Sequence, residues 1–304
     1  MKPEILVFGS IWPDDVLATL DQHFVCHRQP FPDDLTRVRG VLTTGTIGIS
    51  AALADSLPAL EIVAVHAVGL DALPLAHLAA RGVIVTNTPD VLTEDVADLA
   101  LGLLLAANRR LPMLDQYVRA GHWGEGRPLT PAHSLTGKVA GIHGYGRIGQ
   151  ALARRLRACG MQIRYYQRSE GAEPALRCVS LLDLAEQSDV LVACTPGGAG
   201  TLRAIDADVL AALGPQGTFV NIARGSVVDQ PALIAALESG RLGAAALDVF
   251  EEEPAVPDAL RALPNVVLTP HVGSFTVEAR RAMRDLAVAN LVAHFDGRAP
   301  LTPV

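Results

Sequence analysis

The feature that most constrains this chain is a glycine-punctuated turn near its middle, Gly144-x-Gly146-x-x-Gly149. A short apolar run that begins at Val139 leads into the turn, and after the turn apolar residues recur at helical spacing. A strand, a tight turn and a helix therefore follow one another without a gap. This is the context expected of a βαβ nucleotide-binding unit.

Each glycine of the turn has a mechanical role in such a unit. The first permits the tight turn, the second lets a pyrophosphate approach the backbone, and the third lets the helix pack closely on the strand. The helix N-terminus then offers free N–H donors and a positive dipole end to the phosphates. A tight turn without a ligand is the alternative, but the flanking strand and helix favour a dinucleotide site.

Short apolar runs alternate with helical patterns along the whole chain. The expected strands cover residues 5–8, 38–42, 62–65, 83–85, 163–167, 190–193, 218–222, 244–249 and 266–268. The expected helices include residues 13–21, 50–55, 72–80, 206–213, 229–239 and 277–294. Strands separated by helices imply parallel sheets covered on both faces. The predicted fold class is α/β, with two Rossmann-like doubly wound parallel-sheet domains and a cleft between them.

Two domains of ordinary size fit a chain of 304 residues. We expect a substrate (catalytic) domain in residues 1–98, completed by residues 272–304, because the final helix follows the last strand of the second domain and returns to the first. The dinucleotide-binding domain then covers residues 99–271. A long helix that Thr93 caps is expected to bridge the two domains.

Composition argues against several classes of protein. The formal net charge is −7 with both signs interspersed, which leaves no basic face for nucleic acid or an anionic membrane. The cysteines lack disulfide or zinc spacing, so no metal site is expected and the cytoplasm is the natural compartment. The longest apolar run, residues 96–107, contains Asp98 and is shorter than the roughly 20 residues needed to span a bilayer.

The strand after the glycine turn ends in Gln167-Arg168-Ser169, and this ending bears on the choice of cofactor. NAD sites place an acid about 20 positions after the glycines, where it holds the ribose hydroxyls. Gln167 stands near that position here, whereas an arginine and a serine hydroxyl can bind a 2′-phosphate. We therefore expect NADP (NADPH) to be preferred over NAD. The alternative is that Arg168 is a solvated strand-end charge and NADH is accepted as well.

Three polar clusters fall at successive strand ends in the second half of the chain, and they contain Arg224, Glu253 and His271. Hydride transfer to a 2-keto acid requires a cation that holds the carboxylate and polarises the ketone, and a proton donor for the developing alkoxide. Arg224 and His271 are suitable groups, and Glu253 can orient the imidazole and raise its pKa. Spacing alone leaves a structural role open for each, as a surface ion pair, a helix cap or a solvated face.

Two loops in the first half of the chain are candidates for substrate contact. They are residues 43–47 and the loop that contains Val68 and Gly69. A glycine at that place lets backbone N–H groups approach a small carboxylate. An ordinary strand-to-helix connection explains either loop equally well.

The motifs, taken in order, resemble the D-isomer-specific 2-hydroxyacid dehydrogenases, particularly the glyoxylate/hydroxypyruvate and hydroxyphenylpyruvate reductase branch. The resemblance covers nearly the whole chain, through Val68-Gly69, NTPDVLT from Asn87, GIHGYGRIGQ from Gly141, NIARGSVVD from Asn221, DVFEEEP from Asp248 and TPHVGS from Thr269. It implies NAD(P)H-dependent reduction of a small 2-keto acid, such as glyoxylate, hydroxypyruvate or an arylpyruvate, to the D-2-hydroxy acid.

The resemblance also implies roles for individual residues. Arg224, Glu253 and His271 would be catalytic, and the substrate would be bound by Val68, Gly69, Arg224 and His271. Cofactor contacts would come from Thr93, Gly144, Tyr145, Gly146, Arg147, Ile148, Gly149, Gln167, Arg168, Ser169, Cys194, Thr195, Pro196, Ile222, Ala223, Asp248, His271 and Ser274, with Asp248 near the nicotinamide amide. Family members are usually homodimers joined through the nucleotide-binding domains, and residues 111–123 are our candidate for that contact.

The chain departs from the family pattern at a few positions. His143 stands where the family usually has an apolar residue, and we expect a hydrogen-bonded core histidine there. Ala67 and Leu70 vary the substrate loop and therefore affect the size of substrate it accepts. The loop that contains Gly198 and Gly200 is richer in glycine than usual.

Two other functions remain as alternatives. Formate dehydrogenases share the fold but typically carry glutamine at the Glu253 position and asparagine where Leu92 stands, so this chain looks unlike them. A nicotinamide-sensing binding protein without turnover, similar to the C-terminal binding protein corepressors, is the alternative from a different class. Oxidation of NADPH on addition of a keto acid distinguishes an enzyme from such a sensor.

Overall fold

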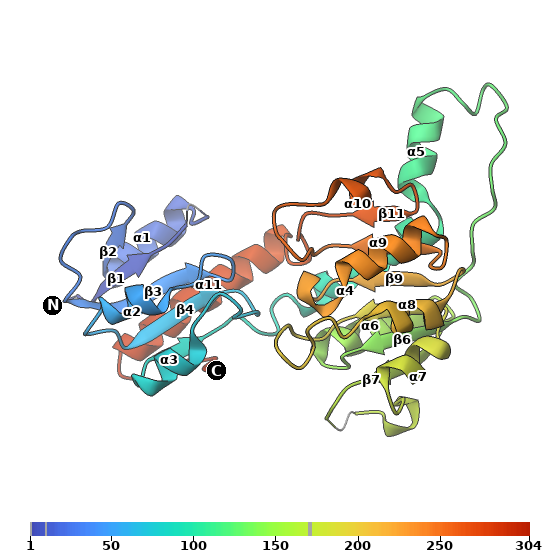
Figure 1. Ribbon diagram of the computed structural model, residues 1–304. Coiled ribbons are helices and arrows are strands. Elements are labelled where there is room, and N and C mark those ends of the chain that lie inside the picture. Colours follow the sequence, from blue (N-terminus) through green and yellow to red (C-terminus); the bar gives the residue numbers. More distant parts are fainter. Residues whose placement is uncertain (1, 10, 170–171) are drawn as a thin grey trace. The chain divides into compact units, whose positions relative to one another are not determined.

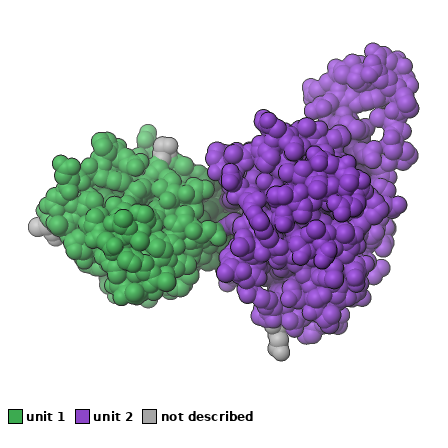
Figure 2. All heavy atoms as spheres, in the orientation of Figure 1, with its two compact units in different colours: residues 1–92, 275–304 green, residues 93–274 purple. Residues whose placement is uncertain are grey.

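The computed structural model describes residues 2–9, 11–169 and 172–304. The chain divides into two compact units, which are residues 1–92 with 275–304 and residues 93–274 (Figure 2). Each unit contains one parallel sheet with helices. The predicted α/β class with two Rossmann-like parallel sheets is thereby confirmed. No helix in the described part of the chain has the length and apolar character needed to cross a membrane.

Unit 1 is built on a five-stranded sheet of order β2-β1-β3-β4-β5 (Figure 1). Its strands are β1 (Glu4–Val7), β2 (Val25–Arg28), β3 (Val38–Thr44), β4 (Ile62–His66) and β5 (Ile84–Thr86). Its helices are α1 (Asp14–His23), α2 (Ala51–Asp55), α3 (Leu75–Ala80) and α11 (Val277–Phe295). The C-terminal helix thus belongs to the unit formed by the N-terminal residues.

Alternation along the strands of unit 1 explains why both faces of its sheet are covered. Ile5 and Ile62 pack with α1 and α11 on one face. Leu6 and Val63, one residue further along each strand, pack with α2 and α3 on the other. Successive side chains of a strand point to opposite faces, so continuous apolar runs require helices on both sides.

Unit 2 contains a six-stranded sheet of order β11-β10-β9-β8-β6-β7. Its strands are β6 (Val139–His143), β7 (Gln162–Tyr166), β8 (Val190–Ala193), β9 (Thr218–Asn221), β10 (Ala244–Leu247) and β11 (Val266–Leu268). Its helices are α4 (Thr93–Asn108), α5 (Leu111–Arg119), α6 (Arg147–Ala158), α7 (Leu181–Glu186), α8 (Ala207–Leu213), α9 (Gln230–Glu238) and α10 (Asp258–Ala262), with 3₁₀ turns η1 (Pro174–Leu176) and η2 (Gly225–Val227).

The helix α4 lies wholly within unit 2, so the division falls after Leu92 rather than after Asp98, and the second division falls after Ser274 rather than after residue 271. Ion pairs fasten α4 to α6, because Arg155 contacts Glu94 at 2.7 Å and Asp98 at 2.6 Å. The sequence indicated the helix correctly. It gave no sign of which sheet the helix packs against.

The strand order of unit 2 creates a switch point between β6 and β8. From β6 the chain moves to β7 on one side and then crosses to β8 on the other. Open parallel sheets bind ligands outside the carboxyl ends of their strands at such a point. The glycine turn follows β6 and the loop with Cys194 follows β8, so both lie at this edge of the sheet.

Candidate active site

A hydrogen-bonded histidine and carboxylate lie in the loops that follow β10 and β11. Nδ1 of His271 and Oε2 of Glu253 are 2.7 Å apart. The other oxygen of Glu253 accepts a hydrogen bond from the backbone N–H of Phe250 at 3.1 Å, which fixes the carboxylate. The His271 side chain is 41% exposed. Because Nδ1 is engaged by the carboxylate, Nε2 is the nitrogen left to exchange a proton with a substrate.

The pKa values of His271 and Glu253 are shifted in opposite directions. The hydrogen bond with Glu253 raises the pKa of His271, although burial and the charge of Arg224 act against it. Burial alone would raise the pKa of Glu253, but its hydrogen bonds with His271 and with the Phe250 N–H outweigh burial and lower it. The pair therefore favours a protonated imidazole held by an ionised carboxylate.

Arg224 follows β9 and leads into the turn η2. Its Nη1 donates to the carbonyl of Ala223 at 2.6 Å, and its own carbonyl accepts a hydrogen bond from the Asn221 side chain at 3.0 Å. The positive charge of Arg224 lowers the pKa of both Glu253 and His271. The next residue, Gly225, packs against the backbone of Phe250 and Glu251 in the loop that leads to Glu253. The structure thus gathers the three residues that the sequence singled out into one cluster.

Gly225 explains why the Arg224 turn can approach the loop after β10. A Cβ atom built on Gly225 would lie 1.8 Å from the carbonyl carbon of Phe250 and 2.3 Å from the nitrogen of Glu251. Only glycine fits such a backbone approach. Sequence reasoning did not assign a role to Gly225, and its one signal was a glycine directly after the arginine.

Asp248 organises the loop that carries His271. Its carboxylate is buried and accepts hydrogen bonds from the Thr269 hydroxyl at 2.6 Å and from the N–H groups of Val272 and Gly273, both at 2.9 Å. Burial raises the pKa of Asp248, while these three hydrogen bonds act in the opposite direction. Its expected contact with a nicotinamide amide stays a prediction, whereas its role in shaping the His271 loop is visible.

The glycine turn has the shape of a pyrophosphate cradle. A Cβ on Gly144 would lie 2.7 Å from the Thr195 nitrogen, and one on Gly149 would lie 2.3 Å from the Gly144 carbonyl oxygen. A Cβ on Gly146, in contrast, would meet no atom within 4 Å. Two glycines are therefore needed for close packing, and the third leaves open space beside the N-terminus of α6. The residues present fit a dinucleotide.

Gln167 and Tyr145 stabilise this turn through a hydrogen bond. The backbone N–H of Tyr145 donates to Oε1 of Gln167 at 3.0 Å. The Tyr145 ring is buried and stacks on Tyr165 with centroids 4.2 Å apart, while its hydroxyl donates to Glu173. The side chain of Tyr145 therefore belongs to the core, and any contact of this residue with a cofactor must use its backbone.

The glycine-rich loop after β8 is closed by one hydroxyl. Oγ1 of Thr201 donates to the carbonyl of Pro196 at 2.8 Å, and the Thr201 N–H donates to the Gly198 carbonyl at 3.0 Å. Thr195, one residue before Pro196, is buried against Gly144. The extra glycines therefore sit in a loop whose two ends are fastened together.

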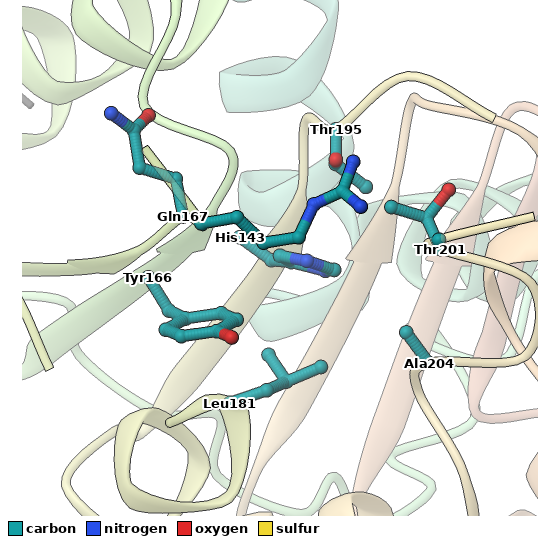
Figure 3. A pocket seen from close by; sticks show the side chains of 9 residues that line it. His143, Tyr166, Gln167, Leu181, Thr195, Thr201 and Ala204 are labelled. Atoms are coloured by element: carbon teal, nitrogen blue, oxygen red, sulfur yellow. The ribbon is translucent and has the colours of Figure 1, made fainter. Parts of the chain in front are cut away.

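A pocket of about 260 Å³ opens at the switch point of unit 2. It is lined by His143, Tyr166, Gln167, Arg168, Leu181, Thr195, Gly200, Thr201 and Ala204. Figure 3 shows the His143 ring at its centre, with Tyr166 and Leu181 on one side and Thr195 and Thr201 on the other. Among the lining residues, Arg168 supplies the positive charge, as expected of a site for a phosphate.

Unit 1 contains the two candidate substrate loops, and the structure brings them together. A Cβ on Gly45 would lie 2.5 Å from Cβ of Ala67 and 3.3 Å from the Gly69 carbonyl oxygen. The carbonyl of Val68 accepts a hydrogen bond from the Asn87 side chain at 3.0 Å. Val68 and Gly69 lie in this unit, whereas the catalytic and cofactor candidates lie in unit 2.

The remaining candidates occupy strand ends and helix starts of unit 2. Thr93 opens α4, Arg147 and Ile148 open α6, Ser169 is exposed after Arg168, Ile222 and Ala223 are buried directly after β9, and Ser274 ends the unit. Three residues that sequence reasoning missed are Asn221, Gly225 and Thr269, which hold the catalytic loops in place.

Comparison with known proteins gives a consistent result. Residues 101–273 match the family model for the NAD binding domain of D-isomer specific 2-hydroxyacid dehydrogenases. The chain is 51% identical over 269 residues to glyoxylate/hydroxypyruvate reductase A of Arabidopsis thaliana, covering 88% of this chain and 85% of that protein. It is 40% identical over 311 residues to 2-ketogluconate reductase of Gluconobacter oxydans, covering 100% and 99% of the two chains.

A solved structure agrees over the full length. The crystal structure of an NADPH-dependent glyoxylate/hydroxypyruvate reductase from Sinorhizobium meliloti, in complex with NADP and malonate, superposes with a TM-score of 0.94 at 46% identity. The match covers 100% of this chain and 97% of that one. The comparisons give no support to a sensing protein without turnover. The chain belongs to the D-isomer specific 2-hydroxyacid dehydrogenase family, and it is an oxidoreductase.

Proposed function

We propose that this enzyme reduces small 2-keto acids, such as glyoxylate, hydroxypyruvate or an arylpyruvate, to D-2-hydroxy acids, with NADPH preferred over NADH. The observation that carries the proposal is the 2.7 Å contact between His271 Nδ1 and Glu253 beside the charge of Arg224. The reductases of Arabidopsis thaliana and Sinorhizobium meliloti act on glyoxylate and hydroxypyruvate, which supports the substrate class.

The chain supplies binding, polarisation and a proton. Arg224 holds the substrate carboxylate and draws electron density from the keto oxygen. A reduced nicotinamide cofactor held at the glycine turn of Gly144, Gly146 and Gly149 would supply the hydride for the keto carbon. As negative charge develops on the keto oxygen, Nε2 of His271 donates its proton there, so that the oxygen becomes the hydroxyl of the product. Glu253 holds the imidazole in orientation and stabilises its protonated form before the transfer.

The backbone N–H groups of Val68 and Gly69 in unit 1 are proposed to bind the substrate carboxylate. Gly45 packs closely against this loop and restrains its conformation. A restrained loop can present its backbone N–H groups in fixed directions. Asp248 acts indirectly, since its three hydrogen bonds fix the loop on which His271 stands.

The preference for NADPH rests on the end of β7. Arg168 is exposed, lines the pocket at the switch point, and has no carboxylate partner among the described residues. Its guanidinium extends to Gly200, where an added Cβ would lie 2.2 Å from Nη1. An arginine in this pocket can pair with a 2′-phosphate, and no carboxylate among the described lining residues is present there to repel it.

Steady-state kinetics on a panel of 2-keto acids tests this function. We expect oxidation of NADPH with at least one of glyoxylate, hydroxypyruvate and an arylpyruvate, and a lower kcat/KM with NADH. Equal or higher kcat/KM with NADH would refute the cofactor preference and leave the reaction class intact. Absence of turnover with every keto acid would refute the reaction itself.

The protein is further proposed to form a homodimer through the segment around α5. This segment stands out from the rest of unit 2 (Figures 1 and 2). It exposes Leu111, Val118 and Trp123, at 50%, 55% and 73%. A second copy would cover such an apolar arm, and the family resemblance implies pairing through this domain. Light scattering is expected to give the mass of a dimer, and Trp123→Glu with Val118→Glu to give a monomer. A monomeric parent protein would refute the pairing.

A cytoplasmic location is proposed as well, on the basis of four cysteines that are all free. Fractionation of cells that express the protein tests it, and recovery from an oxidising compartment would contradict it.

A further inference from the structure

The pocket at the switch point contains one residue that the proposed chemistry does not use. His143 is the last residue of β6 and pairs in register with Tyr166 of β7 and Ala193 of β8. A Cβ on Gly141, two residues earlier, would meet Leu184 of α7, so this face of β6 is the one covered by α7. His143 points to the same face and lines the pocket at its edge.

The imidazole is buried without being satisfied. His143 is 5% exposed, and its Nδ1 has no hydrogen-bond partner within residues 2–9, 11–169 and 172–304. The prediction of a hydrogen-bonded core histidine is therefore wrong at this atom. The Tyr166 ring lies 5.9 Å away at a tilt of 32°, and the Leu181 side chain completes an apolar floor. A buried polar atom without a partner is unfavourable unless a ligand satisfies it.

The charge next to His143 indicates what kind of ligand would satisfy it. Burial and the positive charge of Arg168 lower the pKa of His143 to about 4. The free protein therefore holds a neutral imidazole, which has one N–H donor, close to an arginine. The Thr201 hydroxyl already donates to the Pro196 carbonyl. The imidazole N–H of His143 is therefore a pocket-lining donor that is available to a ligand.

We infer that His143 is a specificity-determining residue for the adenosine 2′-phosphate, which it recognises through an imidazole N–H while Arg168 pairs with the phosphate charge. The inference rests on the proposed preference for NADPH and adds to it a residue that the strand-end motif did not contain. A phosphate offers several acceptor oxygens and can engage both groups at once. A ribose hydroxyl carries no charge and is a weaker partner for the guanidinium.

Burial at the floor of the pocket gives the histidine an advantage over a surface group. Hydrogen bonds to a charged ligand are stronger where water is excluded, and a donor that is held in place by its strand loses little freedom on binding. Arg168, which is long and exposed, provides the attraction. His143 provides a fixed direction.

Calorimetric binding of two nucleotide fragments tests the inference without turnover. The probes are adenosine 2′,5′-bisphosphate and adenosine 5′-monophosphate, titrated into the parent protein and into His143→Val, His143→Leu and His143→Gln. Val and Leu remove the donor, and Gln restores one. His66→Val is the matched control, because His66 is also a buried histidine at the end of a strand, with a pKa lowered to about 4, but lies in unit 1.

The expected result is selective. Val and Leu are expected to weaken binding of the bisphosphate about tenfold, as for loss of one hydrogen bond to a charged group, and to change binding of the monophosphate less than about twofold. Gln is expected to recover most of the loss. The His66 variant is expected to bind both fragments like the parent. The melting temperature reports whether each variant is folded, and the second apolar variant serves if the first is not.

Three results would overturn the inference. If the apolar variants bind the bisphosphate more tightly than the monophosphate by the same factor as the parent, His143 does not recognise the 2′-phosphate. An equal loss for both fragments would assign His143 to adenosine or to the shape of the pocket. A parent protein that binds both fragments equally is a different outcome, since it would refute the proposed NADPH preference itself and the inference with it.

Discussion

The two units of this enzyme are wound in the same way and differ in what their strands end in. Each has a parallel sheet in which the second strand lies outside the first and the third lies on the other side. In unit 2 the strand ends carry Arg224, Glu253 and His271. In unit 1 the corresponding edge carries Val68 and Gly69, whose candidate contribution is backbone. The winding places a site at an edge, and side chains at that edge decide its chemistry.

One buried histidine at a strand end in each unit shows the same difference. His66 ends β4 in unit 1 and His143 ends β6 in unit 2, and both are buried with one unpartnered ring nitrogen among the described residues. Burial lowers the pKa of each to about 4, and in each case an arginine adds to the effect. His143 lines a pocket, and the arginine next to it reaches that pocket too. The two histidines therefore share a local environment, but in the part of the chain that the structure describes only the pocket beside His143 gives a ligand access to a neighbouring arginine.

The largest effect is expected from the charge in unit 2. Arg224→Ala removes both the clamp on the carboxylate and the polarising cation, so kcat/KM for keto-acid reduction is expected to fall by on the order of 10³-fold or more. The dissociation constant for NADPH is expected to change little. Arg203→Ala is the matched control, because this exposed arginine is paired with Glu251 in a neighbouring loop. Retained activity in Arg224→Ala would remove the basis for placing the chemistry in unit 2.

Close packing of loops is expected to be costlier to disturb in unit 2 than in unit 1. A Cβ on Gly225 would lie 1.8 Å from the Phe250 backbone, whereas one on Gly45 would lie 2.5 Å from Cβ of Ala67. Gly225→Ala is expected to lower the free energy of unfolding by about 3 kcal/mol, and Gly45→Ala by less. Urea titration measures both. Gly102→Ala in α4, where an added Cβ meets nothing within 4 Å, serves as a control. A smaller loss of unfolding free energy in Gly225→Ala than in Gly45→Ala would mean that loop packing is tighter in unit 1 than in unit 2.

The carboxylate partner of His271 is expected to set the pH range of reduction. Because Glu253 raises the pKa of His271, the protonated imidazole persists to higher pH, and activity falls as pH rises through that pKa. Glu253→Gln removes the largest cause of the shift and leaves burial and Arg224, which lower the pKa of His271, against the smaller effect of Asp248, which raises it. The alkaline fall is then expected at lower pH, with kcat down about 10- to 100-fold.

The matched control for this measurement is Glu252→Gln, which alters the neighbouring exposed carboxylate of the same loop. Its pH profile of kcat/KM is expected to coincide with that of the parent. An unchanged profile in Glu253→Gln would mean that the contact with His271 plays no part in proton transfer.

The smallest effect is expected in unit 1. If Val68 contributes backbone rather than its side chain, Val68→Ala should change kcat/KM for glyoxylate by less than about fivefold, since the N–H group is kept and only apolar contact is removed. A larger loss, measured by steady-state kinetics with the same substrate panel, would mean that unit 1 supplies specificity through side chains too.

Much of the fold was predictable because buried parallel strands leave a plain signal. Continuous apolar runs such as residues 62–65 and 190–193 indicated β4 and β8. The edge strand β2 was missed, because its residues Val25–Arg28 are half exposed and form no apolar run. The helices α7 and α10 were not predicted, although α2 and α3 are equally short and were.

The site divides in the same way. Side-chain chemistry at strand ends was readable, so the sequence singled out Arg224 and His271. Contacts between loops distant in sequence were not readable, since nothing in the chain shows that Gly225 meets Phe250 or that Asp248 holds the His271 loop. His143 was noticed as unusual. Its missing hydrogen-bond partner depends on how α7 and the strand-end loops fold over it, and that is a tertiary property.

The most direct test of the whole account is the oxidation of NADPH by the parent protein when glyoxylate or hydroxypyruvate is added, measured beside Arg224→Ala. We expect turnover in the parent, loss of turnover in the variant, and similar binding of NADPH by both. A parent protein that binds NADPH and reduces no 2-keto acid, or a variant that reduces keto acids as well as the parent, would contradict it.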